Sequence, residues 1–239
     1  MSAPALDEAT GWLALARAPG LHADHLRAAG WPGSASTLAG ASAAELIRRG
    51  IPATDAVWLS RPDTSVLEAD RRWMAAAGVQ LIGCESEGYP PLLRLIANAP
   101  VALYVKGAPE VLLSAQLAIV GSRSPTAGGA RTAGEFAQFL ARGGLTITSG
   151  LALGIDAAAH AGALRGKGRT VAVLGCGLDE IYPRENSALA TRIVAGGGAL
   201  VSEFPPGTPL RRENFPRRNR LISGLSLGTL VVEAARASG

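Results

Sequence analysis

Residues 116–207 and a short run near the end of the chain decide the fold: QLAIVG (116–121), TAGGARTAGEFAQFLARGG (126–144), LTITSG (145–150), LGIDAAAHAGALRGKG (153–168), RTVAVLGCG (169–177), NSALATRIVAGGG (186–198), ALVSEFPPG (199–207) and LGTLVVEAA (227–235). Short apolar runs alternate with stretches of helical pattern. The runs lack the polar alternation of a half-exposed strand, which is typical of a parallel sheet covered on both faces. The sequence therefore predicts an α/β fold with a Rossmann-like, doubly wound, mostly parallel sheet.

The N-terminal part carries a different pattern. Stretches such as LDEATGWLALARA (6–18) and SVLEADRRWMAAAG (65–78) have apolar residues at helical spacing and stop at proline or glycine. We expect a small all-helical domain over residues 1–75 and the sheet domain over residues 76–239. Because residues 237–239 follow directly on the last predicted strand, we also expect a C-terminally truncated chain.

Composition excludes several classes of protein. Hydrophobic residues make up 48% of the 239 residues and charged residues 18%, unlike disordered or fibrous chains. No apolar run reaches the roughly 18 residues of a membrane span, and the N-terminus lacks the basic and apolar regions of a signal peptide. Cys84 and Cys176 lack metal-binding spacing, so we expect buried reduced thiols, no metal site and a cytoplasmic protein without membrane contacts.

Positive charge is concentrated in the second half of the chain. Residues 1–110 carry nine Lys/Arg against eleven Asp/Glu, a net charge of −2, whereas residues 111–239 carry fourteen against eight, a net charge of +6. Only one of those fourteen cations is lysine. Arginine suits bidentate phosphate contacts and stacking on bases, although a modest positive charge also serves solubility.

The glycine-rich segments follow predicted strands, where ligands bind in open α/β sheets. Gly121, Ser122 and Arg123 follow the first strand of the regular alternation, and Ser149, Gly150 and Gly154 follow the second. Backbone N–H groups at a helix N-terminus attract anions, so these loops predict a phosphate site, or else simple tight turns.

Three other features of these loops have structural interpretations. Asp156 is expected to cap the helix that carries His160, and His160 is expected to pack rather than to react. Gly175-Cys176-Gly177 lacks the GxGxxG pattern of dinucleotide loops, so no cofactor is expected.

The arginine-rich segment is the most informative one. Phe215, Arg217, Arg218, Asn219 and Arg220 follow Arg211 and Arg212 closely, which puts five arginines within ten residues. We interpret the segment as an exposed basic loop. So many guanidinium groups repel one another unless a polyanion lies across them, which favours a nucleic-acid partner over a solvated charged surface.

Enzymatic motifs are missing, so we expect a binding protein. The sequence contains no GxSxG, no P-loop and no HExxH. Residues 224–233 resemble the loop of nucleoside-monophosphate phosphoribohydrolases without its leading Pro-Gly-Gly, which leaves a hydrolase with Glu233 as the acid as the alternative. A structural fragment whose basic segment has no ligand is the third possibility.

An ordered series of motifs resembles one family. The series is AIVGSR (118–123), SGLALGIDAAAH (149–160), VAVLGCGLDEIYPREN (171–186), SEFPPG (202–207), FPRRNRLISGLS (215–226) and VVEA (231–234). In order and spacing it strongly resembles the DNA-processing protein A family (DprA, also called Smf) over about residues 80–239.

The resemblance implies a recombination mediator that binds single-stranded DNA without hydrolysing it. Such a protein protects incoming strands during natural transformation and helps load the recombinase RecA onto DNA coated by single-strand-binding protein. It also implies a homodimer in the full-length form, and a DNA groove. The groove would include Gly121, Ser122, Arg123, Ser149, Gly150, Gly154, Lys167, Arg169, Phe215, Arg217, Arg218, Asn219 and Arg220. Pro19-Gly20-Leu21-His22 lacks the second glycine of a DNA-binding hairpin, so the helical domain is expected to serve packing or partner contacts.

Overall fold

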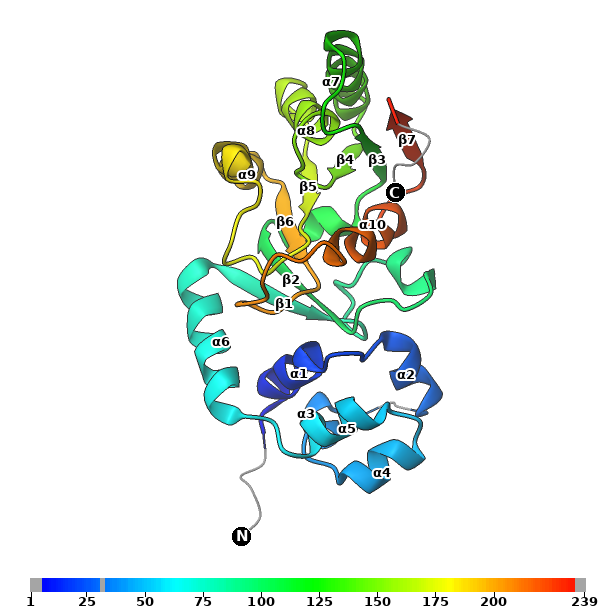
Figure 1. Ribbon diagram of the computed structural model, residues 1–239, viewed down its shortest axis with the longest axis vertical. Helices are drawn as coiled ribbons and strands as arrows, with labels where there is room; N and C mark the ends of the chain where they lie inside the picture. The colour runs from blue at the N-terminus through cyan, green and yellow to red at the C-terminus, as the bar shows by residue number, and fades with distance from the viewer. Residues whose placement is uncertain (1–5, 31–32, 235–239) are drawn as a thin grey trace.

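The computed structural model describes residues 6–30 and 33–234, and Figure 1 shows a helical unit beside an α/β sheet. The end of the chain at residues 237–239, on which the expectation of truncation rested, lies outside the described residues.

Short helices form the N-terminal unit, as predicted. They are α1 (Glu8–Arg17), α2 (Ala23–Ala28), α3 (Ala35–Leu38), α4 (Ala43–Arg48), α5 (Ala53–Ser60) and α6 (Thr64–Ala77). Asp7, Ser34, Ser42 and Asp63 accept hydrogen bonds from backbone N–H groups at four of the helix N-termini. Gly78 ends α6 in the left-handed conformation that glycine adopts without steric cost. These local signals explain why the sequence alone located the helices.

A seven-stranded sheet has the order β1-β2-β6-β5-β4-β3-β7. Its strands are β1 (Val79–Gly83), β2 (Ala102–Gly107), β3 (Gln116–Gly121), β4 (Thr146–Ser149), β5 (Thr170–Val173), β6 (Ala199–Ser202) and β7 (Thr229–Val232). Strands β3 to β7 are mutually parallel, whereas β2 pairs antiparallel with both β1 and β6. The predicted Rossmann-like, mostly parallel sheet is therefore confirmed.

The crossover helices are α7 (Ala127–Arg142), α8 (Ile155–Arg165), α9 (Ser187–Ala195) and α10 (Asn214–Gly224), with short 3-10 turns η1 (Leu93–Leu95), η2 (Pro109–Leu113) and η3 (Arg184–Asn186). The first three crossovers step the same way along the sheet, so α7, α8 and α9 cover one face. The crossover from β6 to β7 steps back past β5, β4 and β3, which puts α10 on the opposite face (Figure 1).

The structure corrects one element. The segment expected to be an exposed basic loop forms α10, because Leu221 and Ile222 are buried on its inner face and Pro216 sits in its first turn, where no intrahelical N–H bond is lost.

One hydrophobic core links the helical unit to the sheet. It runs from Leu13 and Leu59 through Leu103 and Val173 to Leu221 of α10. A smaller core lies between α7, α8 and the strands beneath them. Helix α6 continues to Ala77 and β1 begins at Val79, and the division of the chain into domains at residues 75 and 76 stays a prediction.

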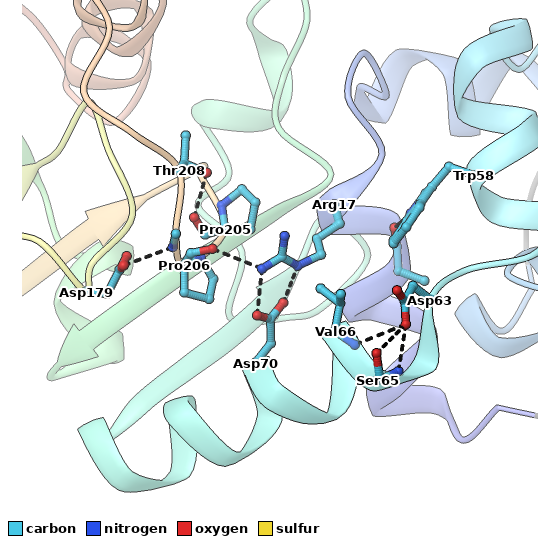
Figure 2. A network of polar contacts seen from close by, with 12 residues as sticks. Arg17, Trp58, Asp63, Ser65, Val66, Asp70, Asp179, Pro205, Pro206 and Thr208 are labelled. Atoms are coloured by element: carbon cyan, nitrogen blue, oxygen red, sulfur yellow. Dashed lines mark hydrogen bonds and ion pairs between the residues drawn. The ribbon is translucent and has the colours of Figure 1, made fainter.

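A polar contact also joins the two parts, as Figure 2 shows. Arg17 at the end of α1 pairs with Asp70 of α6, and its Nη2 donates a hydrogen bond of 2.9 Å to the carbonyl oxygen of Pro206. On the other side of the same loop, the N–H of Gly207 donates to Asp179 at 2.9 Å. The loop between β6 and α10 is therefore held from both sides.

Candidate nucleic-acid interface

The order of the strands reverses between β3 and β7, which is where open α/β sheets bind ligands. A hollow of about 420 Å³ lies at this point. Its lining comes from β3, the β3–α7 turn, the start of α8, α10 and β7, and includes Gly121, Arg123, Asp156, Arg218 and Asn219. The predicted glycine-rich turns and part of the arginine-rich segment therefore meet at one edge of the sheet.

The β3–α7 turn requires glycine at its first position. A Cβ on Gly121 would lie 1.8 Å from the carbonyl oxygen of Val232, so no side chain fits between β3 and β7. Ser122 is fixed by backbone bonds: its N–H donates to Glu233 at 2.8 Å, and its carbonyl accepts from Ile155 at 3.1 Å. The turn then presents Arg123 to solvent.

Arg123 lies over an aromatic ring. Its guanidinium carbon is 5.0 Å from the ring centroid of Phe215, which is half-buried at the start of α10. Stacked guanidinium groups keep their edge N–H groups available for phosphate oxygens. Arg123 and Phe215 thus form an exposed cationic and aromatic pair beside the hollow.

Ser149, Gly150 and Gly154 shape the β4–α8 turn. Ser149 Oγ donates to the carbonyl of Ile119 at 2.6 Å, and Ser149 and Gly150 are buried. Gly154 has a φ of 79° and a Cβ there would lie 2.4 Å from the carbonyl oxygen of Ser122. These residues hold the two turns against each other, and any contact of theirs with a ligand would come from the backbone.

The expectation that Asp156 caps its helix was wrong, because Gly154 is the N-cap of α8 and no side chain caps it, whereas His160 is buried as expected. The Asp156 carboxylate accepts from the N–H groups of Gly150 and Ala152, ahead of the helix rather than at its first turn, and burial raises its pKa. His160 is fully buried and its Nδ1 lies 2.7 Å from Thr170 Oγ1.

Arg218 is a buried structural residue. It is 4% exposed, and its Nη1 donates to the carbonyl oxygen of Gly150 at 2.6 Å and to that of Val173. Burial lowers the pKa of Arg218 to about 10, against the attraction of Asp156. The expectation of an exposed Arg218 was wrong, because this arginine ties α10 to the ends of β4 and β5.

Arg217 and Arg220 share one carboxylate. Glu203 follows β6, its side chain is 3% exposed, and its Oε2 accepts from Arg217 at 3.3 Å and from Arg220. Arg217 also lies over the ring of Phe204, and it keeps 41% of its side chain exposed. Neither arginine is therefore a free cation, whereas Asn219 is exposed beside the hollow.

Lys167 and Arg169 lie elsewhere. Both are exposed and precede β5, whose first residue, Thr170, pairs with Ile147 of β4. They therefore sit at the amino ends of the parallel strands, at the opposite edge of the sheet from Gly121 and Gly150. The structure does not bring them together with the other predicted groove residues, because a segment that enters a strand cannot reach the edge at which its neighbours leave, and a DNA contact at Lys167 and Arg169 stays a prediction from the sequence.

Glu233 is placed unlike a catalytic acid. Its carboxylate accepts from the backbone N–H of Thr126 at 2.8 Å and from the Thr126 hydroxyl, at the N-terminus of α7. These hydrogen bonds lower the pKa of Glu233, whereas a general acid requires a raised pKa. The arrangement disfavours the hydrolase alternative. It also puts one of the chain's own carboxylates at the N-terminus of α7, where a phosphate was expected to bind.

Two residues of this edge were not among the predicted site residues. Asn186 donates from Nδ2 to the carbonyl oxygens of Leu151 and Ala152, which supports the β4–α8 turn. Tyr182 lies beside Phe215, with ring centroids 6.1 Å apart. Both belong to the IYPREN stretch, whose polar and aromatic residues directly after a strand were the available signal.

The described part of the chain has neither a cluster of metal ligands nor a membrane-spanning helix. No three His, Cys, Asp or Glu side chains in residues 6–30 and 33–234 are placed to share a metal ion. No helix in that part of the chain is long and apolar enough to cross a bilayer.

Known proteins resemble both the sequence and the fold. Protein Smf of Escherichia coli is 45% identical over 230 residues, which cover 95% of this chain and 60% of that protein. DNA processing protein DprA of Bacillus subtilis is 42% identical over 163 residues, which cover 68% of this chain and 54% of that protein. The chain thus spans little more than half the length of these relatives.

Two solved structures are similar. The X-ray structure of DNA processing protein A from Streptococcus pneumoniae superposes with a TM-score of 0.80 and 30% identity, covering 96% of this chain and 79% of that one. A structure of DNA processing protein A from Helicobacter pylori, described for its single-stranded DNA binding mode, gives a TM-score of 0.60 and 31% identity, covering 66% of this chain and 72% of that one. The family model for DNA recombination-mediator protein A matches residues 80–239. By its sequence, its fold and the motifs at this sheet edge, the chain belongs to the DNA recombination-mediator protein A family.

Proposed function

We propose that this chain binds single-stranded DNA at the carboxyl edge of strands β3 to β7, and that it does so without catalysis. The observation that carries the proposal is the pair formed by Arg123 and Phe215 beside the hollow at the strand reversal. An exposed guanidinium offers donors to a phosphate, and an aromatic ring offers a face to a base of any sequence. The Helicobacter pylori relative, whose structure is described for binding single-stranded DNA, supports this assignment.

The contacts divide into two groups. Arg123, Phe215, Asn219, Arg211 and Arg212 are half-buried or exposed and are proposed as direct contacts. Arg218, Arg217 and Arg220 are proposed to hold α10 in place, since their guanidinium groups already have partners in the fold.

For the whole protein, we propose the role of a recombination mediator in the cytoplasm. In this role it protects incoming single strands during natural transformation and helps load RecA onto DNA coated by single-strand-binding protein. A homodimer is part of this proposal. This proposal is supported by membership of the DNA recombination-mediator protein A family and by a relative that is named a DNA processing protein.

Fluorescence anisotropy of a labelled dT oligomer of about 20 nucleotides, titrated at 50 and 200 mM salt, tests the DNA proposal. For about five phosphate contacts, affinity should fall roughly 100-fold across this range, and a duplex of the same length should bind more weakly. An affinity that does not change with salt concentration, or an equal affinity for the duplex, would contradict the proposal.

A further inference from the structure

Three side chains from three separate segments pack in series at the carboxyl edge of the sheet. Arg123 comes from the β3–α7 turn, Phe215 from the start of α10, and Tyr182 from the segment between β5 and α9. Arg123 lies 5.0 Å from the Phe215 ring centroid, and the rings of Phe215 and Tyr182 lie 6.1 Å apart with an interplanar angle of 49°. This separation and tilt are those of a packed aromatic pair.

Tyr182 is far more exposed than the other two described tyrosines. Tyr89 is 1% exposed and its hydroxyl donates to the carbonyl of Pro100 at 2.7 Å, and Tyr104 is also 1% exposed. Tyr182 is 45% exposed, and its hydroxyl has no hydrogen-bond partner among residues 6–30 and 33–234. Its ring therefore presents an apolar face to solvent beside a cationic and aromatic pair.

We propose that Tyr182 is a base-stacking position for single-stranded DNA, beside the pair that Arg123 and Phe215 form. The inference rests on the proposed function and specifies the path of the strand. Since the two rings are packed and tilted, no base fits between them, and since Arg123 already lies over the Phe215 ring, the face open to a base is the outer face of Tyr182. The strand then runs from the hollow at β3 and β7, past Phe215, toward the segment that follows β5. Contacts of this kind accept any base, because every base has a π face.

The test compares a dT 20-mer with an abasic oligomer of equal length, which keeps the phosphates and lacks the bases. Stacking on one aromatic ring predicts that Tyr182→Ala weakens binding of dT by roughly 5- to 150-fold and leaves binding of the abasic oligomer unchanged. Tyr182→Phe should bind both oligomers as the wild type does. Tyr182→Leu, which keeps apolar packing without a π face, should behave like Tyr182→Ala.

The outcomes separate this inference from the proposed function. If the wild type binds neither oligomer, both fail. If the wild type binds dT and Tyr182→Ala binds it equally well, or loses affinity equally for both oligomers, the stacking role of Tyr182 is wrong and the DNA proposal stands. A photo-crosslink from a 5-iodouracil oligomer to wild-type protein provides a readout without any variant, and it is expected at Tyr182. A crosslink map that lacks Tyr182 would overturn the inference.

Discussion

The guanidinium of Arg218 donates a hydrogen bond of 2.6 Å to the carbonyl oxygen of Gly150, across 68 residues of sequence. The contact requires glycine at position 150, because a Cβ there would lie 2.5 Å from Arg218 Nη2. The densest cluster of positive charge in the sequence thus contributes one of its arginines to the interior. Some arginines of this cluster stabilise the site, and others face solvent.

The first prediction concerns this interior arginine. Arg218→Ala should lower the free energy of unfolding by about 1–3 kcal/mol, because it leaves the buried carbonyl oxygen of Gly150 without its donor. Urea denaturation measures the change. Arg217→Ala, which removes an arginine one residue away with 41% of its side chain exposed, is the matched control and should cost far less. An Arg218→Ala protein as stable as the wild type would show that the contact to Gly150 does not stabilise the fold.

The second prediction is a dependence of stability on pH that arises from His160. Complete burial lowers the pKa of His160 to about 3, so the folded protein keeps the ring neutral where the unfolded chain binds a proton. Its contribution is fully present above pH 6.5 and is lost as the pH falls, by about 1.4 kcal/mol per pH unit.

The measurement compares wild type and His160→Asn by urea denaturation at pH 7 and pH 5. Asparagine can still donate to Thr170 Oγ1, the partner of His160 Nδ1, and it does not titrate. The wild type should lose roughly 2 kcal/mol more than the variant between the two pH values. The contributions of other titrating groups, including His22, are the same in both proteins and therefore cancel in this difference. Equal losses in both proteins would mean that His160 does not resist protonation.

The third prediction concerns the contact between the helical unit and the sheet (Figure 2). Arg17 and Asp70 have 21% and 5% of their side chains exposed, so their pairing is largely shielded from water. A double-mutant cycle with Arg17→Ala and Asp70→Ala should give a coupling energy in the upper part of the usual range of about 0.5–3 kcal/mol. In addition, Arg17→Ala should expose the loop after β6 to faster proteolysis, because the bond to the Pro206 carbonyl is lost. A coupling energy near zero would contradict this account.

Local and periodic signals in the sequence were sufficient for most of the fold. Apolar runs that alternate with helical stretches predicted the parallel strands, and the glycine at the end of residues 65–78, Gly78, marked a helix end that the structure confirms. The form of α10 was missed because its stability comes from distant partners. Arg218 is held by Gly150, and Arg217 and Arg220 by Glu203, and no local pattern reveals these pairings.

The candidate site was predicted where it follows from topology. The turns at Gly121 and Gly150 come after parallel strands, so both must lie at the carboxyl edge. Lys167 and Arg169 precede a strand, and the same rule applied to them would have put them at the other edge. Tyr182 was missed as a site residue because its position against Phe215 arises only when the β5–α9 segment and α10 fold together.

The most direct test of the central claim is the salt dependence of dT binding by Arg123→Ala beside that of Arg169→Ala. Both variants remove one exposed arginine, but from opposite edges of the sheet. We predict that Arg123→Ala weakens binding and lowers the slope of log affinity against log salt by about 0.7, the value for one phosphate contact on a single strand. Arg169→Ala should leave the slope unchanged. Equal effects of the two variants, or an effect of Arg169→Ala alone, would contradict a DNA site at the carboxyl edge.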